Sequence, residues 1–122
     1  MFGLDGNVRY FLCQKYVDMR KGINGLYNVV KGEMGVSPVS GDVFIFFSKT
    51  RKTVKLLKWD DDGFILYQKR LEDGSFEVPR FNRATNSYEL SWDTFSFIMR
   101  GISLKSVRRR KRFSLPARTI IN

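Results

Sequence analysis

The chain has 122 residues, of which 43% are hydrophobic and 15% aromatic, enough for the core of one domain and too apolar for a disordered chain. Lys and Arg number 22 against 12 Asp and Glu, which gives a net charge of +10. There is no histidine and only one cysteine, which excludes Ser-His-Asp and Cys-His catalysis, zinc fingers, histidine metal sites and a disulfide framework.

The positive charge is concentrated near the C-terminus. Residues 100–122 hold eight basic residues and no acidic residue, whereas residues 1–99 hold fourteen basic and twelve acidic residues. We expect a single domain over residues 1–102, followed by a basic, flexible tail over residues 103–122. A cationic tail on a nearly neutral domain is common in proteins that bind a polyanion such as nucleic acid.

The remaining global features concern localisation and cofactors. The first twenty residues lack the pattern of a signal peptide, and the apolar runs are too short to span a membrane, so we expect a cytoplasmic protein without membrane contact. Cys13 lies in an apolar run and is expected to be a buried small hydrophobe. Neither a Walker loop nor a GxGxxG motif occurs, and no cofactor is predicted.

The N-terminal part of the chain predicts a strand followed by a helix. Residues 8–15 alternate at their centre and predict the strand. An apolar repeat at spacings of three and four predicts a helix over about residues 19–34, with Asp18 as N-cap and Gly35 as stop. The repeat consists of Met19, Ile23, Leu26, Val30 and Met34.

Two features of this predicted helix are locally unfavourable. Arg20 and Lys21 lie in its first turn, where the helix dipole disfavours cations, and Gly22 and Gly25 lie in its interior. A helix N-terminus with two cations is suited to bind phosphate. Alternatively, the cations are solvated or pair with nearby acids, and the glycines let the sheet approach closely.

Residues 43–78 predict an antiparallel meander at the centre of the fold. Its strands are expected at residues 43–47, 53–59, 64–70 and 76–78, with a turn of three cations at residues 48–52. The first strand is apolar throughout and should be covered on both faces. Residues 92–100 predict a second helix, capped by Ser91 and stopped by Gly101. These elements predict an α+β domain with a mostly antiparallel sheet of four to six strands.

The turn after residue 60 decides which residues share a face of the sheet. A three-residue loop over residues 61–63 would place Lys55, Trp59, Tyr67 and Lys69 on one face. A loop of two or four residues would break this assignment, because a slip of one residue turns a strand over. Aromatics among cations suit phosphate contact with stacking, a protein interface, or a second buried face under a helix.

Asp60, Asp61 and Asp62 form the only carboxylate cluster of the chain. As an enzyme, the protein would use them to hold Mg²⁺ for phosphodiester chemistry. Three consecutive residues do not converge on one ion, however, and Asp with Gly is typical of a hairpin turn. We therefore favour the turn interpretation and predict no metal site.

Residues 108–112 form an uninterrupted cationic block, Arg108-Arg109-Arg110-Lys111-Arg112. Because no acidic residue balances this block, we interpret it as a contact with nucleic acid rather than as a solubilising tail. Such a contact would be independent of base sequence.

Several segments together form a specific pattern, in order and without large gaps. They are DMRKGINGL at residues 18–26, GDVFIF at 41–46, KLLKWD at 55–60, Gly63-Phe64, and YQKRLE at 67–72 followed by Gly74, Phe76 and Pro79. With this pattern, residues 7–102 resemble the small accessory protein, often called TnpB or the product of the second open reading frame, of the sixty-six family of insertion sequences. The chain departs from the family at Asp61 and Asp62, and the resemblance fades after Ile102.

The resemblance implies a bacterial protein needed for transposition beside a separate, larger transposase. The family has no assigned catalytic residues, so no active site is carried over. We predict a non-enzymatic accessory protein that binds DNA electrostatically, at the transposon ends, and contacts the transposase. The alternatives are a protein-interaction module without DNA binding and a Mg²⁺-dependent nuclease that uses residues 60–62.

The predicted functional residues are of two kinds. Cations expected to contact nucleic acid are Arg20, Lys21, Lys55, Lys69, Arg70, Arg108, Arg109, Arg110, Lys111 and Arg112. Two aromatic residues, Trp59 and Tyr67, are expected to stack on bases or to anchor a protein interface.

Overall fold

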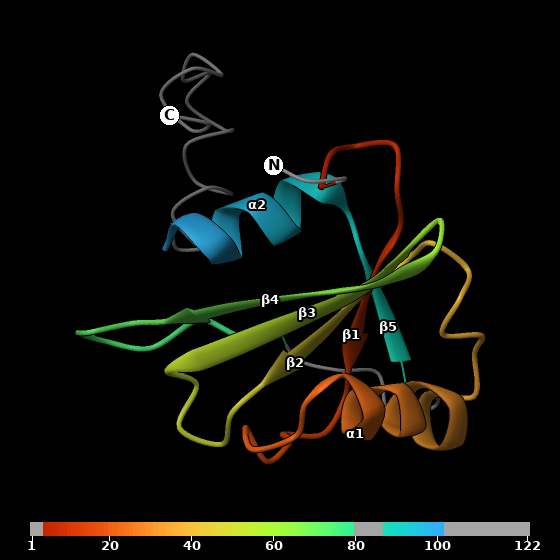
Figure 1. Ribbon diagram of the computed structural model, residues 1–122. Coiled ribbons are helices and arrows are strands. Elements are labelled where there is room, and N and C mark those ends of the chain that lie inside the picture. The colour runs from red at the N-terminus through yellow and green to blue at the C-terminus, as the bar shows by residue number, and fades with distance from the viewer. Residues whose placement is uncertain (1–3, 80–86, 102–122) are drawn as a thin grey trace.

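A five-stranded sheet forms the middle layer of the molecule (Figure 1). The structure is a computed structural model, which describes residues 4–79 and 87–101. The strands, β1 (Tyr10–Cys13), β2 (Val43–Phe47), β3 (Thr53–Asp60), β4 (Gly63–Arg70) and β5 (Ser87–Leu90), lie in the order β4-β3-β2-β1-β5. All neighbouring pairs are antiparallel except β1 and β2. The predicted α+β fold with a mostly antiparallel sheet is confirmed.

Helical segments lie over both faces of the sheet. In Figure 1, α2 (Trp92–Arg100) lies over one face, and α1 (Ile23–Asn28) with the π-helical segment η1 (Val29–Met34) lies over the other. The segment from β1 through α1 and η1 to β2 is the crossover that a parallel strand pair requires. The helix after the first strand and the helix near the C-terminus both agree with the prediction.

Strand β2 is buried along its whole length, as predicted. Because side chains alternate along a strand, Val43, Ile45 and Phe47 belong to the core on the α2 face, whereas Phe44 and Phe46 belong to the core on the α1 face. The core on the α2 face also contains Tyr10, Leu12, Val54, Leu56, Phe76, Leu90, Phe95 and Ile98, and the core on the α1 face also contains Cys13, Leu26, Val30, Met34 and Leu57. The domain therefore has two apolar cores, one on each face.

Tyr10 joins the sheet to α2. Its ring stacks on that of Phe95 with 4.3 Å between centroids, and its hydroxyl donates to the backbone carbonyl of Asp5 at 2.8 Å. Burial raises the pKa of Tyr10 to about 12, because the ionised phenolate would be poorly solvated at this position. A stacked, neutral aromatic pair fixes one end of α2 on the sheet.

The register of the β3–β4 hairpin differs by one residue from the prediction. Asp60 pairs with Gly63, so Asp61 and Asp62 alone form the loop. The positive φ of 57° falls on Asp61 rather than on Gly63, and Asp is one of the few residues that tolerate this conformation. The expectation that Gly63 ends a three-residue loop was therefore wrong.

This shift of one residue divides the predicted mixed face. Lys69 pairs with Val54 and Tyr67 pairs with Leu56, so these two β4 residues lie on the α2 face. Lys55 and Trp59 alternate with that set and lie on the α1 face. The surface predicted from Lys55, Trp59, Tyr67 and Lys69 does not exist as one face, and the alternative of a sheet covered on both sides is correct.

Two other predicted elements are also corrected. The first helix begins at Ile23 with Gly22 as N-cap, because Asp18 forms a turn in which its carboxylate accepts from the Arg20 N–H at 2.8 Å. Residues 76–78 form no strand; instead, the Phe76 N–H donates to the Arg51 carbonyl at 2.7 Å and its ring is buried.

The helix ends follow the sequence more closely. The Ser91 hydroxyl accepts from the Thr94 N–H at 3.1 Å, and Gly101 ends α2 with a φ of 75°. Gly35 ends η1 with a φ of 69°. Both glycine stops and the Ser91 cap are therefore confirmed.

Replacing Asp61 by glycine should stabilise the domain by about 1 kcal/mol, because glycine adopts a positive φ without the clash that a Cβ creates. Urea unfolding, followed by tryptophan fluorescence, measures the change. Asp62→Gly is the control, since it removes a carboxylate from the same loop at a residue whose φ is not positive. Equal stability of the two variants would contradict the two-residue loop.

Candidate nucleic-acid interface

The strand directions bring several cationic segments to one end of the sheet. This end contains the last residues of β2 and β4 and the first residues of β3. The turn between β2 and β3 contributes Lys49, Arg51 and Lys52, all exposed. Arg70 pairs with Thr53, and the neighbouring Leu71 N–H donates to the Lys52 carbonyl at 2.8 Å, which joins the end of β4 to this turn.

The loop between β1 and α1 reaches the same end. The Val17 N–H donates to the Phe47 carbonyl at 3.0 Å, which fastens the loop to the end of β2. The Lys55 ammonium group donates to the carbonyls of Met19 and Lys21, both at 2.8 Å. The exposed Arg20 and Lys21 therefore lie at the same end of the sheet as the cations of the β2–β3 turn.

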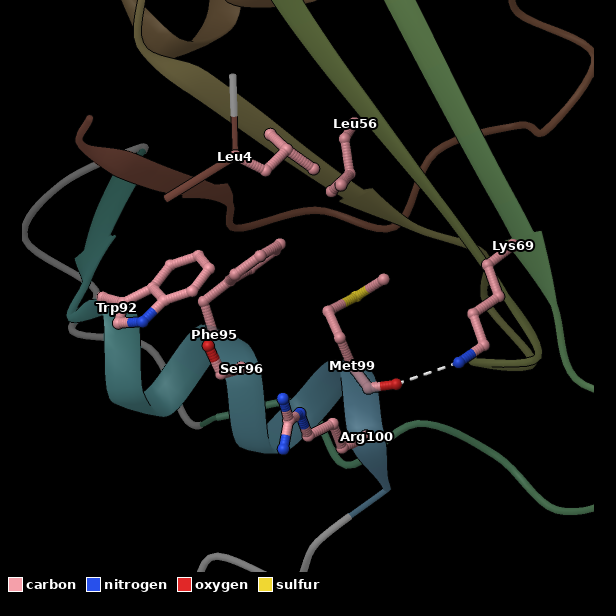
Figure 2. A pocket seen from close by; sticks show the side chains of 8 residues that line it. All are labelled: Leu4, Leu56, Lys69, Trp92, Phe95, Ser96, Met99 and Arg100. Carbon is pink, nitrogen blue, oxygen red and sulfur yellow. Dashed lines mark hydrogen bonds between the residues drawn. The ribbon is translucent and has the colours of Figure 1, made fainter. Parts of the chain in front are cut away.

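The C-terminal end of α2 completes this arrangement. The Lys69 ammonium group donates to the Met99 carbonyl at 3.0 Å, and Arg100 follows on the last turn of the helix (Figure 2). We use the name basic end for the exposed cations Arg20, Lys21, Lys49, Arg51, Lys52, Lys69, Arg70 and Arg100. The chain leaves the described domain at Gly101, so the basic tail, which lies outside the described residues, begins at this end.

Acidic residues lie at both ends of the sheet, but they face different numbers of cations. Asp42 precedes β2, and residues 60–62 form the β3–β4 turn. Near the basic end, the acidic residues are Asp18, Glu72, Asp73 and Glu77. The eight cations outnumber these four carboxylates, whereas at the opposite end, within the described residues, only Arg9 and Lys58 face Asp42 and residues 60–62. Among these residues, the domain therefore has a positive end and a negative end along the strand direction.

Arg20 is partly neutralised within the basic end. Its guanidinium group binds the Asp18 carboxylate, with 2.6 Å between Nη2 and Oδ2. The hydrogen bonds from Arg20 hold the pKa of Asp18 below its usual range, and the same carboxylate raises the pKa of Arg20. Both side chains are in contact with solvent, since 91% of the Arg20 side chain and 45% of the Asp18 side chain are exposed. The alternative that Arg20 pairs with a nearby acid is therefore correct.

Lys55 belongs to the folded framework and not to the surface. Only 6% of the residue is exposed, and its ammonium group is held by the two carbonyls of the loop before α1. A charge at this depth requires hydrogen-bond partners, and the loop supplies them. We therefore remove Lys55 from the predicted phosphate contacts and assign it the role of tying the β1–α1 loop to β3.

The two predicted aromatic anchors are separated by the sheet. Trp59 packs edge-on against Phe64 on the α1 face, with 5.0 Å between ring centroids, near the acidic hairpin. Tyr67 packs against the core on the α2 face, and burial raises its pKa. Neither residue belongs to the basic end, so stacking by this pair on one bound ligand is ruled out by the register.

The carboxylates of residues 60–62 form the hairpin turn that the sequence favours. Asp60 closes the β3–β4 ladder, and the exposed Asp61 and Asp62 form the loop itself. Across residues 4–79 and 87–101, no group of three His, Cys, Asp or Glu side chains has the geometry of a metal site.

Sequence reasoning selected Arg20, Lys21, Lys69 and Arg70 but left the β2–β3 turn and Arg100 out of the site. The only available signal for the turn was its three cations between two strands, a pattern that is also common in ordinary solvated turns. The residues of the cationic block at 108–112 lie outside the described part of the chain.

The fold and this surface define a class, namely a small α+β domain with exposed cations gathered at one end. The chain belongs to the family described as IS66 Orf2 like protein, which matches residues 8–109. The match extends past Ile102, where the resemblance was expected to fade, and includes the first two arginines of the cationic block. The family implies a transposition-associated accessory protein, in agreement with the sequence-based identification.

Two curated relatives come from Sinorhizobium fredii (strain NBRC 101917 / NGR234). Uncharacterized protein y4jC is 31% identical over 110 residues, which cover 90% of this chain and 92% of the relative. Uncharacterized protein y4hO is 28% identical over 96 residues, which cover 79% of this chain and 82% of the relative. No solved structure is significantly similar to the chain. Among the described helices, none has the length and apolar character needed to cross a membrane.

Replacing Lys55 by methionine should lower the free energy of unfolding by about 1–3 kcal/mol, because two partly buried carbonyls lose a charged donor. Lys49→Met, at an exposed turn position, is the control and should change stability by less than about 0.5 kcal/mol. Urea unfolding measures both variants. A Lys55→Met protein with native stability and weakened DNA binding would restore the phosphate role of Lys55.

Proposed function

We propose that this protein is a non-catalytic accessory factor of transposition that binds DNA electrostatically through its basic end and C-terminal tail. We also propose that it assembles with the transposase of the same element. Membership of the IS66 Orf2 like family supports the transposition context. DNA at the transposon ends is the proposed nucleic-acid partner.

The observation that carries the DNA proposal is the convergence of separate cationic segments at one end of the domain. The β1–α1 loop, the β2–β3 turn, the end of β4 and the end of α2 each contribute exposed Lys or Arg side chains. The tail, with a further seven cations over residues 102–122, starts at the same end. A rigid cationic surface continuous with a basic tail is suited to follow a phosphate backbone.

This mode of binding positions the protein without reading base sequence. Lys and Arg contacts to phosphate oxygens carry no sequence information, so specificity for the transposon ends would come from the transposase. In this proposal the transposase performs the chemistry, and the accessory protein acts only by binding.

Removing two cations of the basic end should reduce the salt dependence of DNA binding. For Lys52→Gln combined with Arg70→Gln, the slope of log K against log salt should become shallower by about 1.8, because two phosphate contacts are lost. Fluorescence anisotropy with a labelled 30-base-pair duplex, over a salt series, measures the slope.

The matched control carries the same change in charge elsewhere. Arg9→Gln combined with Lys31→Gln alters two exposed cations away from the basic end, one beside Asp42 and one on η1. It should leave the slope nearly unchanged. If both double variants change the slope equally, net charge alone binds DNA. If deletion of residues 103–122 abolishes binding and Lys52→Gln with Arg70→Gln has no effect in the full chain, only the tail binds.

Asp18→Asn should strengthen DNA binding by about two- to fivefold at low salt, because it removes a carboxylate from the basic end and releases Arg20. The lowered pKa of Asp18 keeps this carboxylate ionised, so the difference should persist from about pH 5 to pH 8. Asp62→Asn, at the opposite end of the sheet, is the control. Unchanged or weaker binding by Asp18→Asn would exclude Arg20 from the DNA contact.

A further inference from the structure

A cleft lies between α2 and the outer strands of the sheet (Figure 2). It has a volume of about 300 Å³ and adjoins a second hollow of about 190 Å³ along β4, with which it shares Leu56, Lys69 and Met99. Leu56 lies on the sheet side, whereas Phe95 and Met99 project from α2 toward it. The cleft is therefore a mainly apolar trough between a helix and a sheet.

The position of the cleft favours a polypeptide as its occupant. Strand β4 is the outermost strand on this side, and within the described residues it pairs with β3 alone. An edge strand presents unpaired backbone groups, which an incoming peptide can satisfy while its side chains enter an adjacent apolar pocket. Trp92, which is 39% exposed, adds a large aromatic surface at the other end of the trough.

The positive charge of the residues that line the cleft indicates which kind of polypeptide it would bind. Lys69 and Arg100 are the charged residues of the lining, and no acidic residue lines either hollow. Residues 102–122 of this chain contain seven cations and no carboxylate, so they are poorly suited to a site with a cationic rim. A second copy is disfavoured by the net charge of +10. An acidic segment would complement Lys69 and Arg100, which form the cationic rim of the cleft.

We propose that this cleft binds a segment of a protein partner in which apolar residues are flanked by Asp or Glu. The inference rests on the proposed assembly, and within that proposal the segment belongs to the transposase. The apolar side chains would fill the trough beside Phe95 and Met99. The flanking carboxylates would pair with Lys69 and Arg100 at its rim.

The first test fills the cleft without altering its charge. Ser96 lines the trough from α2 and is only partly buried, so Ser96→Trp blocks it while leaving the core intact. With purified transposase and nuclease-treated samples, biolayer interferometry should show binding weakened at least about tenfold. Asn24→Trp, an exposed helical position on the other face, should bind like the native protein. Circular dichroism checks that both variants are folded.

The second test reverses the charge at the rim. Arg100→Glu should weaken transposase binding at least about tenfold, whereas Lys31→Glu, with the same change in charge on η1, should not. Since Ser96→Trp changes no charge, its affinity for DNA should remain within about twofold of the native value. Native transposase affinity in both Ser96→Trp and Arg100→Glu would overturn the cleft proposal while leaving the proposed assembly in place.

A crosslinking experiment identifies the occupant directly. Ser96→Cys can be labelled with a benzophenone maleimide, because the native Cys13 is only 3% exposed and burial raises its thiol pKa. After irradiation with the transposase, mass spectrometry should find a transposase peptide with apolar residues and flanking carboxylates. Crosslinks to residues 102–122, to a second copy, or to a transposase segment without nearby carboxylates would overturn the proposal.

The outcomes also separate this inference from the proposed function. If the native protein captures no transposase, the assembly half of the proposed function and the cleft proposal both fail. DNA binding through the basic end is measured without the transposase, so its result stands independently. Capture that depends on Ser96 and Arg100 supports both the assembly and the cleft.

Discussion

The complete burial of β2 is the constraint on which the rest of the structure depends. All five residues of this strand are apolar and buried, so neither face of the sheet at its centre can meet water. A helical layer must therefore cover each face, and the alternation of side chains divides the apolar residues between two cores. Most exposed charged residues consequently lie at the ends of the strands or at the edge of the sheet, whereas Lys55 and Lys58 of the interior strand β3 are buried.

This displacement explains why the functional surface lies at an end of the sheet rather than on a face. Because neighbouring antiparallel strands run in opposite directions, every second connection between them lies at the same end of the sheet. The β1–α1 loop is held at this end by the ammonium group of Lys55, which donates to two of its carbonyls. Lys55 thus acts on the candidate interface indirectly, because it fixes the position of Arg20 and Lys21. The negative end, with its Asp-rich hairpin, would orient the domain on a polyanion by repulsion.

The two proposed surfaces are neighbours but differ in chemistry. The basic end is solvated and cationic, which suits a phosphate backbone, whereas the cleft under α2 is apolar with a cationic rim, which suits an acidic segment of protein. Lys69 lies where they meet, since it lines the cleft and bonds to the end of α2. A protein that holds DNA and a transposase at adjacent surfaces could bring the two together without performing chemistry itself.

The sequence alone determined the family, the fold class, the buried central strand, the two glycine stops and the Ser91 cap. These features depend on residues that are close together in the chain, so they can be recognised in the sequence itself. The faces of β3 and β4 could not be obtained in this way, because they depend on which residue of the Asp61-Asp62-Gly63 turn adopts a positive φ. Only the tertiary structure placed Lys55 inside and gathered the cations of four separate segments at one end, since strand pairing and loop anchoring join residues that are distant in the chain.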